Sequence, residues 1–179
     1  CRCGEVGFDV SVDAKSDSRI VCYCNSCRAF AEKTGAAGTL DPSGGVDLFQ
    51  TAVERLAISR GADRLAWTRI TARGPLRWFA TCCGAPVANT LPTRQIPFAT
   101  MMSDGFCEPD ALPPILGRVN KRDATAHIEG DMGHPGKAIP AFFKRALKSR
   151  LTGAYKRNPF FTAQGRPIAD GPTEPNGTA

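Results

Sequence analysis

Short runs in which apolar and polar residues alternate dominate the chain up to about residue 108. The stretch 6–12 alternates in this way, which is typical of a strand with one buried face. Further β-like runs are found at 19–22, 46–51, 55–59, 65–71, 76–81 and 96–102. Turn signals such as Gly44-Gly45 separate these runs, and a short helical segment is expected at 28–33. The pattern predicts a mainly β fold built from small antiparallel sheets.

The clearest helical pattern lies near the C-terminus. Between Pro140 and Leu151 the apolar residues recur at helical spacing, and Gly153 is placed to end the helix. We expect the Phe142/Phe143 face to pack on the protein's own domain, with the lysines in water. Binding of this basic helix to an anionic membrane or to nucleic acid is the alternative.

These patterns divide the chain into three parts. Residues 1–108 form the β domain, residues 109–161 form an extension that carries the basic amphipathic helix, and residues 162–179 are expected to be a disordered tail because Ala, Gly, Pro and Thr dominate there. No run approaches the ~18 apolar residues of a membrane span. The chain also shows no export signal.

The net charge of +6 is concentrated in one segment. No acidic residue occurs between Met132 and Ala169, whereas that segment contains Lys137, Lys144, Arg145, Lys148, Arg150, Lys156, Arg157 and Arg166. The rest of the chain is slightly acidic. Because the basicity belongs to the extension rather than to the β domain, the overall charge does not predict a nucleic-acid-binding protein.

The eight cysteines are the main candidates for chemistry. Seven of them are clustered in sequence, at Cys1, Cys3, Cys22, Cys24, Cys27, Cys82 and Cys83. Cysteines one or two residues apart seldom form a disulfide, which needs Cα atoms about 5.5 Å apart, whereas zinc binds crowded thiolates tetrahedrally at roughly 2.3 Å. A disulfide framework is the alternative. The clustering and the lack of an export signal favour zinc binding in a reducing cytosol.

The cysteines form two candidate zinc sites. Cys22, Cys24 and Cys27 supply three ligands, and an open fourth position would be typical of a catalytic zinc. On chemistry alone, a closed structural site with Cys107 or another residue as the fourth ligand is favoured. The second site is a tetrathiolate of Cys1, Cys3, Cys82 and Cys83. It requires a turn at the adjacent Cys82 and Cys83, and a partly filled or metal-free site is its alternative. His127 and His134 are isolated and are not expected to bind metal.

The order of the cysteine signatures resembles that of the glutathione-dependent formaldehyde-activating enzyme family, which includes the centromere protein V group. The resemblance covers residues 1–102 and rests on Cys1-Arg2-Cys3-Gly4-Glu5-Val6, Val21-Cys22-Tyr23-Cys24-Asn25-Ser26-Cys27-Arg28 and Cys83-Gly84-Ala85-Pro86. It implies the family's zinc-bearing β-tent fold. It also implies an active-site zinc on Cys22, Cys24 and Cys27, and a structural zinc on Cys1, Cys3 and the late cysteines.

The resemblance implies an activity as well. The family's reaction is the condensation of formaldehyde with glutathione to S-(hydroxymethyl)glutathione, a reaction of the carbon–sulfur lyase type. The open zinc position would take the glutathione sulfur as a thiolate. Arginines would hold the carboxylates of the peptide, because a guanidinium fork suits a carboxylate; the candidates are Arg28, Arg69, Arg73 and Arg77.

The chain departs from the family's motifs at two positions. Ala80 stands where the late C-x-x-C-G motif has its first cysteine, and Tyr23 stands where the middle motif usually has histidine. We therefore expect a divergent branch. The alternative function is a non-catalytic, zinc-stabilised binding module whose basic helix contacts an acidic partner. No oligomeric state is predicted.

Overall fold

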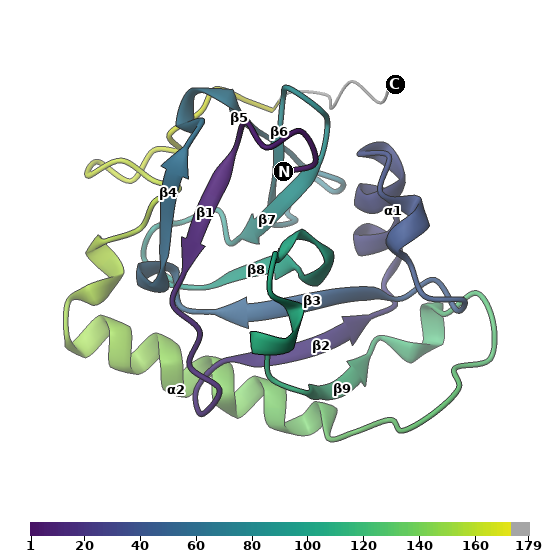
Figure 1. The fold of residues 1–179 in the computed structure, drawn as a ribbon. Helices are drawn as coiled ribbons and strands as arrows, with labels where there is room; N and C mark the ends of the chain where they lie inside the picture. The colour runs from purple at the N-terminus through teal and green to yellow at the C-terminus, as the bar shows by residue number, and fades with distance from the viewer. Residues whose placement is uncertain (173–179) are drawn as a thin grey trace.

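The structure is a computed structural model that describes residues 1–172. Within these residues, two α-helices, α1 (Asn25–Lys33) and α2 (Ala138–Leu151), accompany nine strands (Figure 1). The strands are β1 (Gly7–Val10), β2 (Ser18–Cys22), β3 (Val46–Thr51), β4 (Leu56–Arg60), β5 (Leu65–Thr68), β6 (Leu76–Ala80), β7 (Pro86–Thr90), β8 (Ala99–Met102) and β9 (Ile115–Val119). The prediction of a mainly β fold with a C-terminal helix is confirmed. Among the described residues, no helix is both long enough and apolar enough to cross a bilayer.

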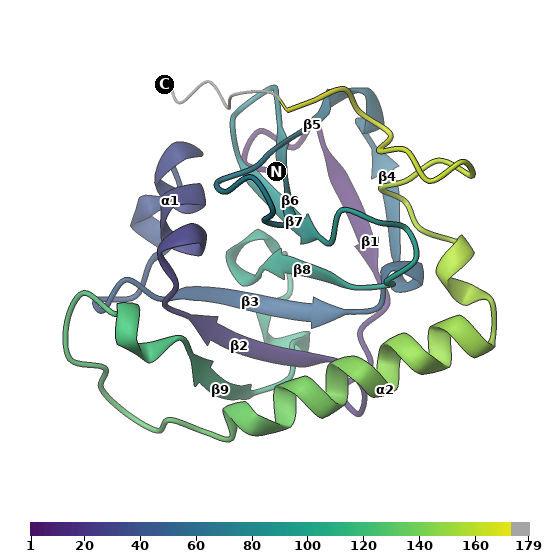
Figure 2. The ribbon, with the colours of Figure 1, turned by 180° about the vertical axis from the view of Figure 1, so that it is seen from behind.

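The strands form two sheets. The larger sheet has the order β5-β6-β7-β8-β3-β2-β9, and β1 pairs with β4 in a separate ribbon. Neighbours in the large sheet are antiparallel except β2 and β9, which are parallel. Strand β9 lies in the segment interpreted as an extension, where no strand was predicted. The extension therefore completes the edge of the main sheet beside β2 (Figure 2).

Strand β6, which lies between the edge strand β5 and β7, is buried on both faces. Leu76, Trp78 and Ala80 belong to the core between the large sheet and the β1–β4 ribbon. Arg77 and Phe79 point to the opposite face because strand side chains alternate, and there Phe79 packs with Phe30 of α1. A buried arginine is thus directed from this strand towards α1.

Helix α2 packs on the domain through a face different from the predicted one. Ala138, Arg145 and Ser149 are its buried residues. Phe142 is half-buried, with its ring 5.0 Å from that of Phe98. Phe143 is 63% exposed, so the prediction that the Phe142/Phe143 face packs inward is wrong for Phe143. Hydrogen bonds from Arg145 and Ser149 to the domain set this orientation.

The chain after α2 returns to the core. Phe160 is fully buried and its ring lies 5.0 Å from that of Trp78, so the segment after the helix docks on the core. The indole of Trp67 donates a hydrogen bond of 3.1 Å to the Ala169 carbonyl. The disorder expected from residue 162 onward therefore does not hold for residues 162–172, and residues 173–179 lie outside the described part of the chain.

Candidate metal centres

The first cysteine group lies at the junction between β2 and α1. Cys22 is the last residue of β2, Cys24 is the N-cap of α1, and Cys27 lies in the first turn of that helix. The three Sγ atoms lie within 4.8 Å of one another. The sharp turn from strand to helix brings the three side chains together, and the Cys27 N–H donates to Cys24 Sγ at 3.4 Å.

Tyr23, between the first two cysteines, takes no part in the group. Its side chain is fully buried and its hydroxyl donates to Asp41 Oδ2 at 2.7 Å. Arg118 in turn donates to the Tyr23 hydroxyl at 2.7 Å. Because neighbouring strand residues face opposite ways, the residue at this position supports the loop containing Asp41 rather than the sulfurs.

Two side chains from distant parts of the chain contact these sulfurs. The guanidinium of Arg77 lies 3.6 Å (Nη1) and 3.7 Å (Nη2) from Cys27 Sγ, and Asn120 Nδ2 lies 3.3 Å from Cys22 Sγ. Arg77 is held in place by hydrogen bonds to Asn89 Oδ1 (3.0 Å) and Ser26 Oγ (2.8 Å). N–H groups directed at sulfur are the usual outer partners of metal-bound thiolates, since they offset the negative charge on the sulfur.

The three thiols differ in acidity. Hydrogen bonds from Cys22 and Cys27 lower the pKa of the Cys24 thiol well below its usual range. The hydrogen bond with Cys24 raises the pKa of Cys22, and the hydrogen bonds with Cys22 and Cys24 raise the pKa of Cys27. Three sulfurs this close cannot all be ionised without a cation among them. The donor set therefore fits a soft divalent ion such as zinc.

The second group joins the N-terminus to the β6–β7 turn. Its four Sγ atoms, from Cys1, Cys3, Cys82 and Cys83, lie within 4.8 Å of one another. The Sγ–Sγ distances are 3.2 Å for Cys3–Cys82, 3.5 Å for Cys1–Cys3 and 3.9 Å for Cys1–Cys82. Zinc–sulfur bonds of roughly 2.3 Å in a tetrahedron place sulfurs about 3.8 Å apart. The four sulfurs thus fit a single tetrahedral ion.

The turn that this group requires is present. Gly84 has a φ of +68°, in the left-handed region that glycine adopts readily, and its N–H donates to the Ala80 carbonyl at 2.8 Å. Burial raises the pKa of Cys82 to about 11, with a contribution from Cys3. Burial also raises the pKa of Cys83. Hydrogen bonds from the backbone N–H groups of Ala85 and Cys3 outweigh this effect and lower the pKa to about 7.

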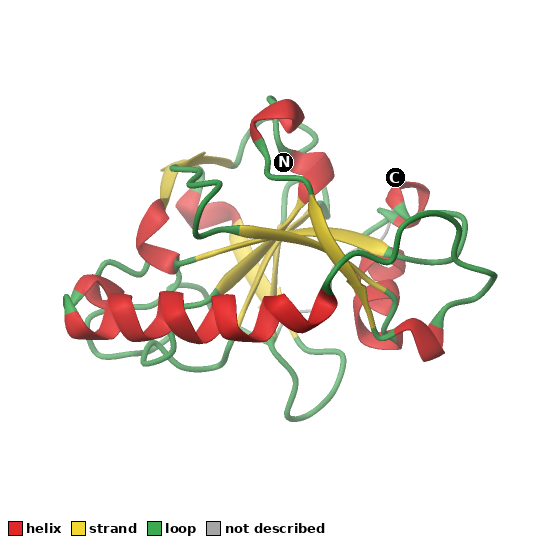
Figure 3. Cartoon of the chain, turned by 90° about the horizontal axis from the view of Figure 1, so that it is seen from below, coloured by secondary structure: helices red, strands yellow, loops and turns green. Residues whose placement is uncertain are grey.

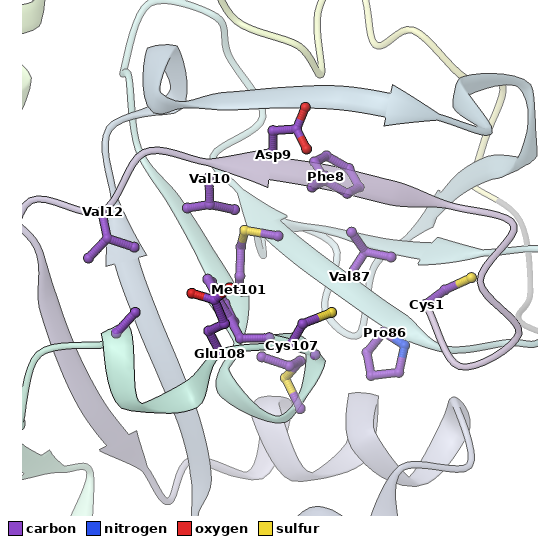
Figure 4. A pocket seen from close by; sticks show the side chains of 14 residues that line it. Cys1, Phe8, Asp9, Val10, Val12, Pro86, Val87, Met101, Cys107 and Glu108 are labelled. Carbon is purple, nitrogen blue, oxygen red and sulfur yellow. The ribbon is translucent and has the colours of Figure 1, made fainter.

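Cys107 and the histidines belong to neither group within residues 1–172. Cys107 is exposed and lines a cavity of about 490 Å³, so the alternative that it is the fourth ligand of the first group has no support in the geometry. The cavity lies between β1 and strands β7 and β8, next to Cys1 (Figure 4). Phe8, Val87 and Met101 give it apolar walls.

The four candidate arginines divide into two pairs. Arg77 contacts the first group, and Arg28 lies beside it in α1, donating to the Asp123 carbonyl at 3.0 Å. Arg69 and Arg73 lie in the β5–β6 turn, where Arg69 bonds to the Ala72 carbonyl and stacks on Trp67. Neither of these two makes a recorded contact with a cysteine in the described part of the chain.

The sequence did not reveal Asn120, Asn89 or Ser26 as site residues. Asn120 follows β9 and reaches Cys22 only because β9 pairs with β2. Its φ of +56° is unusual for a residue other than glycine. Beside it, residues 120–123 line a shallow hollow of about 430 Å³ that includes Lys121 and Arg122. No signal in the sequence predicts these contacts, since they arise from strand pairing for Asn120 and Asn89 and from the packing of β6 against α1 for Ser26.

The comparisons with known proteins identify the family but no activity. The chain belongs to the Family of unknown function (DUF6151), whose model matches residues 1–171. No curated protein matches the chain. A solved structure of a Rhodobacter sphaeroides protein, a structural-genomics target, is 21% identical with a TM-score of 0.41, covering 62% of this chain and 90% of that one.

Proposed function

We propose that this member of the DUF6151 family is a zinc protein that catalyses thiol–aldehyde adduct chemistry of the carbon–sulfur lyase type, similar to S-(hydroxymethyl)glutathione synthesis. One observation carries the proposal: three sulfurs lie together with a buried arginine against one of them, Cys27, and no fourth Cys, His, Asp or Glu of residues 1–172 joins their group. Such a set favours three protein ligands and an open position, which is typical of catalytic zinc.

The residues around the first group suit an anionic sulfur substrate. When bound, a zinc ion would supply a Lewis acid that favours the thiolate form of an incoming thiol at neutral pH. Three cysteine thiolates and a divalent ion carry one net negative charge. The Arg77 guanidinium offsets that charge at Cys27, while Asn120 donates to Cys22. A further thiolate can then approach a nearly neutral site rather than a negative one.

Three basic residues near the first group are the proposed partners for the carboxylates of a peptide thiol. Arg28 is next to the cysteines in α1, and Lys121 and Arg122 are exposed at the hollow beside Asn120. Paired hydrogen bonds from a guanidinium are the strong form of carboxylate recognition. We propose these three, in place of Arg69 and Arg73, as the glutathione-binding cations.

The proposed reaction balances without an oxidant or reductant. The substrate sulfur forms a bond to the aldehyde carbon, the carbonyl π bond breaks, and the thiol proton is transferred to the aldehyde oxygen. The product is a hydroxymethyl thioether. Every atom of the product comes from the thiol and the aldehyde. The role proposed for the protein is therefore to accelerate the reaction and not to supply a further reactant.

The second group has a separate role in the proposal. Its four sulfurs join the first residues of the chain to the β6–β7 turn, about eighty positions further along. A metal there closes a long loop and stabilises the fold. We therefore assign Cys1, Cys3, Cys82 and Cys83 to a structural zinc.

The second candidate function is a binding module without catalysis. The basic helix α2, whose outer face is exposed, favours it, because such a face offers a surface for an acidic partner. The two candidates differ in what the first cysteine group does. Only the enzyme requires Cys24, whereas the module would retain its binding without the metal of that group.

The experiment combines metal analysis with an adduct assay. Purified protein is expected to contain about two zinc ions per chain by mass spectrometry of the metals. With isotopically labelled formaldehyde and glutathione, exchange NMR should show faster adduct formation than in buffer. Cys24→Ala should lose one zinc and the acceleration, whereas the matched control Cys107→Ala, which removes a cysteine outside both groups, should keep both.

Two results would overturn the enzyme proposal. One is zinc-loaded protein that does not accelerate the adduct reaction with glutathione. The other is a Cys24→Ala variant that accelerates it as well as the unsubstituted protein.

A further inference from the structure

Helix α2 presents most of its large apolar residues to solvent rather than to the core, with the half-buried Phe142 as the exception. The other four are among the most exposed apolar side chains of the described chain: Ile139 63%, Phe143 63%, Leu147 61% and Leu151 78%. Each follows the previous one by four positions, so they lie next to one another along the helix. We call these four residues the apolar stripe.

The inner face of the helix is polar and is fixed by hydrogen bonds. Arg145 is 6% exposed and donates to the Ser16 carbonyl and to Ser18 Oγ, and Ser149 is 1% exposed and donates to Glu54 Oε2 at 2.8 Å. Turning the apolar stripe inward would break these bonds, which hold the buried Arg145 and Ser149 and the half-buried Glu54. The exposure of the stripe is therefore built into the docking of the helix.

The surroundings of the apolar stripe are positively charged. Lys137, Lys144 and Lys148 are exposed beside it, and no acidic residue occurs between Met132 and Ala169. An exposed apolar row of this size marks an interaction surface. The occupant of this surface should combine an apolar interior with negative charge at its boundary.

We propose that α2 docks this protein on the surface of an anionic lipid bilayer. The apolar stripe would enter the boundary between headgroups and acyl chains, and the three lysines would contact the negative headgroups, as in amphipathic helices that lie in a membrane surface. The helix has 14 residues and is about 21 Å long, so it lies along the surface and does not cross it.

The shape of the surface favours a bilayer over a protein groove. Seen from below, α2 crosses in front of the strands along one side of the molecule (Figure 3). Its inner half is covered by the protein's own domain, so a groove that wraps around a helix cannot enclose it. A flat surface can receive the exposed half of the helix without displacing the domain.

The charge distribution disfavours a second copy of the chain as the occupant. Two such helices packed against each other would bring Lys144 and Lys148 of both copies together. No acidic side chain of the same segment is present to pair with them. Negative lipid headgroups pair with every one of these lysines.

Vesicle flotation with the full chain tests the proposal. The protein should float with vesicles of phosphatidylcholine containing 30% phosphatidylserine, and far less with pure phosphatidylcholine. Raising the salt from 0.1 to 0.5 M should reduce binding because headgroup contacts are screened. The double variant Phe143→Ser/Leu147→Ser should reduce it at least tenfold, and Lys144→Glu/Lys148→Glu should do the same.

Matched controls separate these effects from loss of folding. Ile168→Ser removes an exposed apolar residue outside the helix (37% exposed), and Arg73→Glu reverses a charge in the β5–β6 turn. Both should float like the unsubstituted protein. Every variant should retain its melting temperature to within a few degrees, since the changed side chains lie in solvent.

Several results would overturn the proposal. It fails if the folded protein does not float with phosphatidylserine vesicles, if it floats equally with pure phosphatidylcholine, or if Phe143→Ser/Leu147→Ser floats like the unsubstituted protein. It also fails if sedimentation shows a dimer that this variant abolishes while no vesicle binding occurs, because the stripe would then be an interface between copies.

Discussion

The Nη1 atom of Arg77 lies 3.6 Å from the Sγ atom of Cys27, although the two residues are separated by fifty positions in the chain. Arg77 is 4% exposed and lies on β6, and Cys27 lies in the first turn of α1, which packs against that strand. A buried guanidinium needs anionic partners. Metal-bound thiolates at Cys27 and its neighbours would supply them, and the charge of a metal site there would then be tied to the core of the fold.

Arg77→Met should weaken zinc binding at the first cysteine group. Loss of an outer partner of a metal ligand typically costs 10- to 100-fold in affinity. Competition with a chromophoric chelator measures this change. Arg77→Lys should recover part of the affinity because it keeps the charge, and Arg69→Met is the control in the β5–β6 turn. Equal zinc affinity in the Arg77→Met variant and the unsubstituted protein would contradict the role of Arg77.

Cys3→Ala and Cys24→Ala should have different effects on stability. Cys3 belongs to the group that closes a loop of about eighty residues, and Cys24 belongs to a group formed within one strand–helix junction. We expect Cys3→Ala to lower the free energy of unfolding by about 3 kcal/mol, the stabilisation given by a ligand present at roughly a hundred times its dissociation constant. Cys24→Ala should cost much less.

Urea unfolding at constant free zinc measures the two free energies. A chelator should reduce the difference between Cys3→Ala and the unsubstituted protein, since it removes the metal from both. Equal and small losses in both variants would contradict the division into a structural site and a functional site.

Stability should depend on pH through Asp17. This carboxylate is 7% exposed and accepts hydrogen bonds from Thr51 Oγ1 (2.9 Å) and the Asp13 N–H (2.8 Å). Burial raises the pKa of Asp17 above 3.8, against the opposing effects of those bonds and of Arg55 and Arg145. The folded protein thus keeps the proton at pH values where the unfolded chain has lost it. The free energy of unfolding therefore falls as the pH rises through this range.

Asp17→Asn should remove this decrease in the free energy of unfolding with rising pH. The stability of the variant relative to the unsubstituted protein should increase as the pH rises from about 3.8 and then level off above the folded-state pKa of Asp17. Urea unfolding curves at several pH values measure the difference. A difference that stays constant or decreases with pH would show that the carboxylate is not penalised by burial.

Gly117 should tolerate no side chain. It lies in β9, and a Cβ atom there would be 2.5 Å from the backbone nitrogen of Pro135. Gly117→Ala should therefore lower the free energy of unfolding by about 1–3 kcal/mol, the usual cost of overpacking. Gly105→Ala is the matched control, since a Cβ at Gly105 has nothing within 4 Å. Similar melting temperatures for the two variants would show that β9 shifts freely.

Much of the fold could be predicted from local pattern. Alternation at 6–12 and 46–51 corresponds to β1 and β3, and the apolar spacing at 140–151 corresponds to α2. Each of these signals lies within the segment that forms the element. Strand β9 was not predicted, because the segment 115–119 has little alternation and becomes a strand only by pairing with β2.

The orientation of α2 on the domain could not be predicted from its sequence. The sequence displays which residues share a face of the helix, and the usual assumption places the apolar face inward. Here hydrogen bonds from Arg145 and Ser149 to Ser16, Ser18 and Glu54 decide the orientation. Those partners lie far away in sequence, so the pattern within 138–151 carried no information about them.

The sequence by itself determined the first group of sulfurs and the two halves of the second, Cys1 with Cys3 and Cys82 with Cys83, because cysteines so closely spaced must lie near one another. Folding brought those two halves together across about eighty positions. Only the tertiary structure decided what surrounds those sulfurs. Arg77 reaches Cys27 because β6 packs against α1, and Asn120 reaches Cys22 because β9 pairs with β2. Such contacts depend on the register and packing of segments fifty to a hundred residues apart, which no local spacing encodes.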